Sequence, residues 1–261
     1  MTYQGKPKNR TFENVKGFWD ATAHKFGKDP SGVIRDIHFR NLEITETIKY
    51  LSNDDDAIDV GCGNGYGTSK FASFVKTIIG VDYSKTFVDI ANGLSRFQNT
   101  SFAVADARSL PFTDNKFNKV IAQRLLINLP GKEDQFRVLD ELHRILKPNG
   151  FLISTEVTRQ GHAKIDEYRR KAGLLPLEKY WHNLYIDEDE FFEYIKGKFE
   201  VLKVRRFGMY HFVSKILHPL IVFPNEPKFD ARINEVARKL ANRFNEFEDC
   251  SHQLLAVLKK L

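Results

Sequence analysis

The feature that most constrains this chain is a regular alternation of short apolar segments with helical segments between residues 57 and 157. Five segments have the length and composition of buried strands, at 57–60, 77–82, 101–106, 117–124 and 151–157. Helical periodicity occupies the intervening stretches 66–75, 84–97 and 132–146. Strand, helix and strand at this spacing form crossover units, which build a parallel sheet with helices on both faces. We therefore expect an α/β fold that binds ligands at the carboxyl ends of its strands.

The flanking sequence extends this pattern less regularly. Residues 1–30 are predicted to form an irregular N-terminal arm, because turn-forming residues cluster at 6–9 and 27–32. Residues 31–261 are predicted to form a single domain. Its further elements are helices at 33–51, 187–198 and 229–247 and strands at 199–207 and 251–261. Two aromatic-rich stretches, 158–186 and 210–228, interrupt the alternation, and we expect them to be inserted lids over the substrate.

Composition and charge limit the class of protein. Cys62 and Cys250 are too few and too far apart for a disulfide framework or a zinc pattern, and no apolar secretory segment is visible, so a cytoplasmic protein is expected. The longest apolar run, 216–223, is short and broken by His218 and Pro219, and no membrane partner is expected. The net charge of +6 suits an anionic partner, but no RNA-binding motif accompanies it, so nucleic acid is not favoured.

A glycine-rich loop, Asp59-Val-Gly-Cys-Gly-Asn-Gly-Tyr-Gly67, follows the first strand. Such a loop lets the backbone approach a ligand closely, and the next helix directs its N-terminal N–H groups toward that ligand. The glycine spacing does not match the dinucleotide fingerprint G-x-G-x-x-G, and no Gly-Lys-Ser/Thr completes a phosphate-binding loop. Asp82 and Asp106 stand at the ends of the next two strands, where acids can bind ribose hydroxyls and an adenine amino group. Together these features predict a nucleoside-containing cofactor.

These segments resemble the conserved motifs of class I S-adenosylmethionine-dependent methyltransferases. The resemblance rests on residues 58–65, 80–84, 105–121 and 142–151. It implies a Rossmann-like, seven-stranded, mostly parallel sheet, with S-adenosyl-L-methionine as the cofactor. It further implies a set of cofactor-binding residues: Asp59, Gly61 and Gly63 for the methionine part, Asp82 and Tyr83 for the ribose and one face of the adenine, Asp106 and Ala107 for the adenine edge, and Gln123 behind the methionine part. Arg40, on a helix similar to the N-terminal helix of related enzymes, would pair with the cofactor carboxylate or be an exposed helix residue.

The acceptor is expected to be a small molecule, with an oxygen of a sugar or nucleotide-linked metabolite as the methylated atom. An oxygen acceptor of high pKa needs a general base, and we expect His182 first and His211 second, with packing as the alternative role for either. The other candidates are His24, His38, His162, Tyr185 and Tyr210. No metal site is expected, since the acidic run 187–190 suits a helix N-terminus. The alternatives are an RNA or protein methyltransferase, a non-catalytic domain that binds the cofactor or a partner, and a disfavoured NAD-dependent enzyme.

Overall fold

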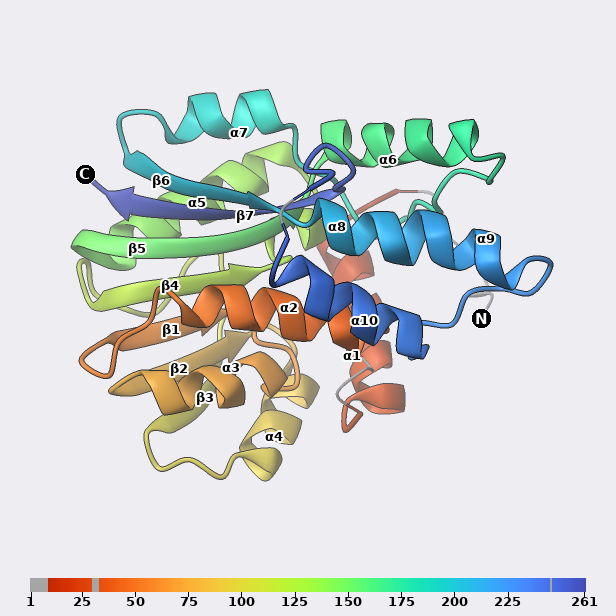
Figure 1. Cartoon of the computed structure of the whole chain (residues 1–261). Coiled ribbons are helices and arrows are strands. Elements are labelled where there is room, and N and C mark those ends of the chain that lie inside the picture. The colour runs from red at the N-terminus through yellow and green to blue at the C-terminus, as the bar shows by residue number, and fades with distance from the viewer. Residues whose placement is uncertain (1–8, 30–32, 245) are drawn as a thin grey trace.

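A single seven-stranded sheet organises the computed structural model, which describes residues 9–29, 33–244 and 246–261 (Figure 1). Its strand order is β3-β2-β1-β4-β5-β7-β6. The strands are β1 Asp56–Val60, β2 Thr77–Asp82, β3 Thr100–Val104, β4 Phe117–Gln123, β5 Leu146–Val157, β6 Phe199–Arg206 and β7 Gln253–Lys260. Strands β1 to β5 pair in parallel, and β7 runs antiparallel to both β5 and β6. The predicted mostly parallel α/β sheet is confirmed.

Helices cover both faces of this sheet. They are α1 Phe12–Phe26, α2 Ile37–Ile48, α3 Tyr66–Phe71, α4 Lys85–Leu94, α5 Lys132–Ile145, α6 Arg159–Lys171, α7 Glu188–Ile195, α8 Gly208–His211, α9 His218–Val222 and α10 Arg232–Ala241. Short helical turns η1 Ala72–Phe74 and η2 Leu126–Asn128 and a π-helical segment η3 Phe212–Leu217 complete the set. Several elements are shorter than predicted because of local caps. Helix α2 begins at Ile37 rather than residue 33, since Asp36 accepts a hydrogen bond from the Phe39 amide at 3.0 Å.

The prediction of an irregular arm at residues 1–30 is wrong for its central part. Residues 12–26 form helix α1, which begins after Thr11, whose side chain accepts a hydrogen bond from the Asn14 amide at 3.3 Å. The helix buries Val15 and Ala23, eight residues apart on one face. Flanking turn residues dominated the sequence pattern, whereas the helix depends on its contacts with the rest of the domain. Residues 1–8 and 30 lie outside the described part of the chain.

Alternation along the central strands divides the core into two layers. Leu152 of β5 joins a cluster with the α5 residues Val138, Leu139 and Leu142. The next residue, Ile153, points to the other face and packs with α2 and α10. In Figure 1, α2 and α10 accordingly lie in front of the sheet and α5 behind it. Because helices cover both faces, polar residues concentrate at the two ends of the strands, which we call the amino edge and the carboxyl edge of the sheet.

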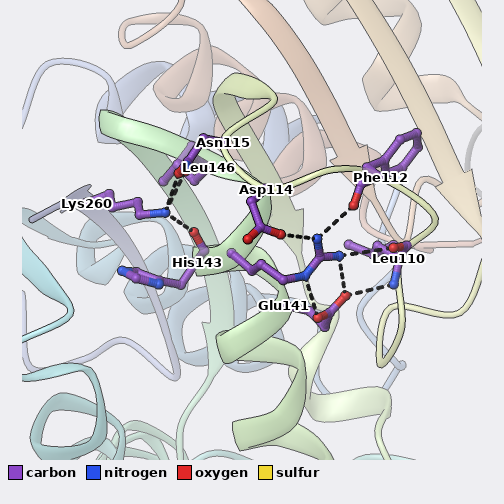
Figure 2. A network of polar contacts seen from close by, with 9 residues as sticks. Leu110, Phe112, Asp114, Asn115, Glu141, His143, Leu146 and Lys260 are labelled. Carbon is purple, nitrogen blue, oxygen red and sulfur yellow. Dashed lines mark hydrogen bonds and ion pairs between the residues drawn. The ribbon is translucent and has the colours of Figure 1, made fainter.

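The amino edge of the sheet is fixed by a polar network (Figure 2). Arg144 of α5 donates hydrogen bonds to Glu141, Asp114 and two backbone carbonyls of the loop that follows β3. Lys260, at the end of β7, donates to the Asn115 side chain at 2.9 Å and to two backbone carbonyls near the start of β5. These contacts join three segments distant in sequence, so the amino edge is structural and the carboxyl edge is available for a ligand.

Both expected lid segments leave the sheet at its carboxyl edge. Residues 158–186 follow β5 and contain α6, and residues 210–228 follow β6 and contain η3 and α9. The two segments pack together through Ile165 and Ile216, which share a cluster with Cys250 from the segment before β7. Their role as lids remains a prediction.

Candidate functional site

The glycine-rich loop forms a tight turn between β1 and α3. Gly61, Gly63 and Gly65 have φ angles of 78°, 54° and 74°, a left-handed conformation that side chains other than glycine rarely adopt. The Gly61 and Cys62 amides donate to the Val81 carbonyl at 2.8 and 3.0 Å, which joins the loop to β2. Gly61 is exposed, so its backbone is open to a ligand.

Asp82 ends β2 and connects this loop to α4. One carboxyl oxygen accepts the Gly63 amide at 3.0 Å, and the other accepts the Ser84 amide at 2.9 Å. Each oxygen keeps a further lone pair that can accept a ribose hydroxyl. Burial raises the pKa of Asp82 to about 6, so the carboxyl group is mostly ionised at neutral pH. Its placement fits the expected ribose-binding role.

Asp59 lies at the end of β1, beneath the loop. It accepts a hydrogen bond from the Thr68 hydroxyl at 2.6 Å, and burial raises its pKa to about 6. Because Thr68 stands in the first turns of α3, this bond sets the position of the helix relative to the strand. Sequence reasoning missed Thr68, which carries no signal apart from its place behind the glycines.

Arg40 projects from α2 into the same polar layer and is 6% exposed. A Cβ atom placed on Gly67 would lie 3.4 Å from Arg40 Nη2 and 3.6 Å from Gln123 Oε1, so these two side chains border the loop together. The Nε atom of Arg40 is buried and has no hydrogen-bond partner among the described residues. Burial lowers the pKa of Arg40 to about 10, which still leaves a cation at neutral pH. The interpretation of Arg40 as an exposed helix residue is therefore wrong.

A buried ion pair that sequence reasoning missed stands beside Arg40. The carboxylate of Glu43, in α2, lies 2.7 Å from the guanidinium of Arg124, the residue that directly follows β4. Arg124 has a φ angle of 57°, and its amide donates to the Thr155 carbonyl at 2.6 Å. Gln123 donates from Nε2 to the Thr47 hydroxyl at 3.2 Å. The end of β4 is thus joined to α2 by two polar contacts.

Glu156 organises the turn that follows β4. This fully buried carboxyl group accepts the amides of Leu126 and Ile127 at 2.9 and 3.2 Å. Burial raises its pKa to about 8. The sequence offered no signal for this role, because Glu156 lies within a strand pattern.

The expected adenine-binding residues lie at the other end of the site. Tyr83 packs edge-on against Phe12 of α1, with ring centroids 5.5 Å apart, and Ala107 is buried in the main core. Asp106 accepts hydrogen bonds from the Arg108 guanidinium at 2.7 to 3.1 Å. Burial would raise the pKa of Asp106, but the Arg108 hydrogen bonds outweigh it and lower the pKa.

Helix α1 crosses the carboxyl edge of the sheet above these residues. Asp20 accepts a hydrogen bond from the Ser84 hydroxyl at 2.6 Å, and Trp19 donates from its indole to Asn128 at 3.1 Å. Past the end of the helix, the carbonyls of Gly27 and Asp29 accept from the Asn64 amide group, each at 3.1 Å. The helix and the residues after it therefore contact the loops that follow β1, β2 and β4. This is the covering position that the sequence predicted for the two later insertions.

His182, in the first insertion (158–186), packs against helix α1. Its ring stacks on Phe18 with centroids 4.0 Å apart and lies edge-on to Trp19 at 5.6 Å. The side chain is 8% exposed, and in the described part of the chain its Nδ1 atom has no hydrogen-bond partner. Burial lowers the pKa of His182 to about 4, so the imidazole is neutral at physiological pH and can accept a proton.

His211 lies elsewhere, as the last residue of α8. It is 1% exposed, has Nδ1 3.2 Å from the Ser251 hydroxyl and packs against Phe39 and His252. Among the described residues, no ring contact or hydrogen bond joins it to His182. Of the two predicted bases, His182 has the more favourable surroundings.

The other candidates are dispersed. Tyr210 donates to Asp36 at 2.5 Å, His162 packs on Tyr185, and the exposed His24 lies 3.4 Å from the Thr86 hydroxyl. His38 lies on α2. The described part of the chain holds no group of three or more His, Cys, Asp or Glu arranged for a metal ion. The acidic run instead begins α7, where Asp187 accepts the amides of Asp189 and Glu190 at 3.0 and 3.1 Å.

Comparisons with known proteins agree with this geometry. Residues 58–154 match the family model of the methyltransferase domain. An uncharacterized methyltransferase of Schizosaccharomyces pombe is 33% identical over 123 residues, which are 43% of this chain and 43% of the relative. A demethylmenaquinone methyltransferase of Staphylococcus saprophyticus is 28% identical over 152 residues, 57% of this chain and 61% of the relative. The chain thus spans less than two thirds of these relatives.

Among solved structures, the methyltransferase found in complex with the Trm112 methyltransferase activator of Haloferax volcanii has the same fold. The TM-score is 0.64 at 19% identity, over 93% of this chain and 97% of the other. The sheet order and the glycine loop agree with these matches. Residues 58–154 therefore match a methyltransferase domain, and the chain has the fold of that solved methyltransferase.

Proposed function

We propose that this protein transfers a methyl group from S-adenosylmethionine to a small-molecule acceptor. The observation that carries the proposal is the buried Arg40 guanidinium, whose Nε atom lacks a partner beside the glycine loop. A buried cation with an unused donor is costly unless a ligand completes it. A carboxylate at this position would supply the missing acceptor.

The remaining polar groups fit the rest of such a cofactor. The open backbone at Gly61 would accommodate the methionine part, and Asp82 would accept the ribose hydroxyls. Tyr83 and Asp106 would border the adenine, with Ala107 next to Asp106 in the loop after β3, while Gly63 in the glycine loop would border the methionine part. Gln123 and Asp59 would complete the wall behind the methionine part. When bound, the cofactor supplies an electrophilic methyl group on a positively charged sulfur.

The surroundings of His182 support a small aromatic acceptor with an acidic hydroxyl. The rings of Phe18 and Trp181 contact His182, and aromatic walls of this kind bind flat apolar molecules. A base with a pKa of about 4 removes a proton more readily from a phenol-like hydroxyl, with a pKa near 10, than from a less acidic sugar hydroxyl. The sequence favoured a sugar or nucleotide-linked acceptor, and this acceptor is the alternative that the experiment below compares with the aromatic one. The name of the demethylmenaquinone methyltransferases also indicates a small-molecule acceptor.

In the proposed reaction, most of the rate enhancement comes from positioning the acceptor relative to the methyl group. The sulfonium is an activated leaving group, so the protein has to hold the acceptor oxygen in line with the methyl group and exclude water. Helix α1 would serve this purpose, because it bridges the loops after β2 and β4 through Asp20 and Trp19. His182 would receive the hydroxyl proton at Nδ1, the atom without a partner.

The test uses methyl-labelled S-adenosylmethionine and three groups of acceptors: phenols and hydroxyquinones, nucleotide sugars, and tRNA or protein substrates. We expect label in the first group, and we expect His182→Gln to lower kcat by about 100-fold or more without changing the affinity for S-adenosylhomocysteine. His24→Gln is the matched control, since His24 is exposed near the end of α1. Label confined to sugars, RNA or protein, or a His182→Gln enzyme of full activity, would reject the proposed acceptor and base. Absence of cofactor binding would reject the proposed function itself.

A further inference from the structure

Three large apolar side chains stand out by their exposure. Leu175, Phe223 and Ile221 are 83%, 78% and 69% exposed, the highest values for large apolar side chains in the described part of the chain. Two less exposed neighbours, Leu217 and Leu220, continue the same surface at 36% and 44%. We call these five residues the apolar tip. Apolar side chains exposed in a group of this size indicate an interaction surface, whereas scattered ones do not.

Contacts in the fold bring the two halves of the apolar tip together. Leu175 follows α6, whereas the other four residues lie in or next to α9. Arg169 bridges them, because its guanidinium donates to the Leu175 carbonyl at 2.6 Å and also to the Lys215 carbonyl just before Leu217. In Figure 1 the turn after α9 projects beyond the rest of the ribbon on the right, and the loop after α6 lies at the same end.

The segments that carry the apolar tip are also basic. Residues 159–179 and 207–244 contain twelve Lys and Arg against six Asp and Glu, whereas the whole chain contains 40 against 34. These two segments therefore carry an excess equal to the entire net charge of +6. Arg170, Lys228 and Arg232 are exposed, and none of them forms an ion pair with a described residue. The remainder of the chain has no net charge.

We propose that the apolar tip docks on an anionic lipid surface. A projecting group of leucine, isoleucine and phenylalanine side chains inserts among acyl chains without needing a complementary groove, and basic neighbours at the rim contact anionic headgroups. The shape argues for lipid over a protein partner, since the tip projects outward and protein interfaces require a matched opposing surface. The described part of the chain has no helix able to cross a membrane. The expectation of no membrane partner rested on that kind of segment, whereas peripheral docking requires only a few side chains.

Docking at this tip would orient the molecule. Both basic segments leave the sheet at its carboxyl edge, after β5 and β6, so the edge that carries the glycine loop would lie near the lipid surface. The lipid contact itself does not depend on methyl transfer and can be tested without a cofactor or an acceptor.

The experiment measures sedimentation of the full chain with vesicles of phosphatidylcholine, with and without phosphatidylserine. We expect binding to the mixed vesicles, weakened by salt, and little binding to phosphatidylcholine alone. Ile221→Ser with Phe223→Ser should lower the partition coefficient by about tenfold or more, and Arg232→Glu should lower it by about fivefold or more. The matched control is Leu94→Ser with Val104→Ser, which removes side chains 45% and 50% exposed in α4 and in β3 at the opposite edge of the sheet.

Four results would overturn the proposal. They are no binding to either vesicle, equal binding to both, an equal loss in the control variant, or a concentration-dependent dimer that the Ile221 and Phe223 substitutions abolish. The last result would assign the apolar tip to an interface between copies of the chain. Circular dichroism of each variant checks that it is folded, and Phe223→Trp offers a second readout that preserves the apolar surface. Its fluorescence should be quenched by brominated lipid in mixed vesicles, and an unquenched signal would contradict insertion.

Discussion

Replacement of Arg40 by leucine should weaken cofactor binding without unfolding the protein. The Glu43–Arg124 ion pair, 2.7 Å apart, persists in this variant, so Glu43 keeps a cationic partner. A hydrogen bond to a charged group contributes about 1.5–3 kcal/mol, and a guanidinium can form two with one carboxylate. Part of that gain is offset by removing Arg40 from water. We therefore expect a loss of about 3 kcal/mol, or roughly 100-fold in Kd.

The assay compares two ligands by isothermal titration calorimetry. S-adenosylhomocysteine carries the amino-acid carboxylate, whereas 5′-methylthioadenosine has the same nucleoside and lacks it. Arg40→Leu should weaken the first ligand by roughly 100-fold and the second by less than about threefold. Arg40→Lys keeps the charge but loses the planar pair of donors, and should be intermediate.

Two results would refute this reasoning. An equal loss for both ligands would mean that Arg40 supports the site as a whole and does not contact the carboxylate. Unchanged affinity for S-adenosylhomocysteine would mean that the carboxylate binds elsewhere. Thermal denaturation of Arg40→Leu provides the control, because a large fall in Tm would attribute the loss to folding.

Three further predictions concern pH and backbone conformation. Asp82, whose pKa burial raises to about 6, must be ionised to accept ribose hydroxyls, so affinity for S-adenosylhomocysteine should fall by about tenfold from pH 7.5 to pH 5. Calorimetry with Asp82→Asn should show weaker binding and a much smaller pH dependence. Gly65→Ala should cost about 3 kcal/mol in urea denaturation, because φ is 74° and the new Cβ would lie 2.8 Å from Phe102, whereas Gly93→Ala, in open helical space, should be neutral or stabilising. The pKa of Glu156 is raised to about 8, so its contribution to stability is fully present below about pH 4.5 and is lost as pH rises through 8. The unfolding free energy of Glu156→Gln should therefore decline less than that of the wild type between pH 4.5 and pH 7, by on the order of 3 kcal/mol, and parallel curves would contradict the assignment.

The parts of the fold that were predicted correctly depend on local pattern. β1 and β2 were located from apolar runs bounded by polar residues, and the sheet class followed from their spacing with the helices. Helix α1 was missed because its stability depends on tertiary contacts such as Asp20 with Ser84 and Trp19 with Asn128. Element ends were less accurate, since a cap such as Asp36 is one polar residue among several in its segment.

The site divides in the same way. Asp59 and Asp82 could be placed from their position at the ends of strands, because the carboxyl ends of parallel strands meet at one edge. The pairing of Glu43 with Arg124 could not be predicted, since the two residues lie far apart in the sequence and neither lies in a recognisable motif. His182 could be singled out only as part of an aromatic cluster, and its partner Phe18 lies on the helix that the sequence did not reveal.

A crystal structure of the protein with S-adenosylhomocysteine would test the central claim most directly. We predict the ribose hydroxyls on the Asp82 carboxylate, the amino-acid carboxylate within hydrogen-bond distance of Arg40, and α1 closed over the nucleoside. A ligand bound away from the glycine loop, or one whose carboxylate points into solvent while Arg40 Nε stays without a partner, would contradict the account.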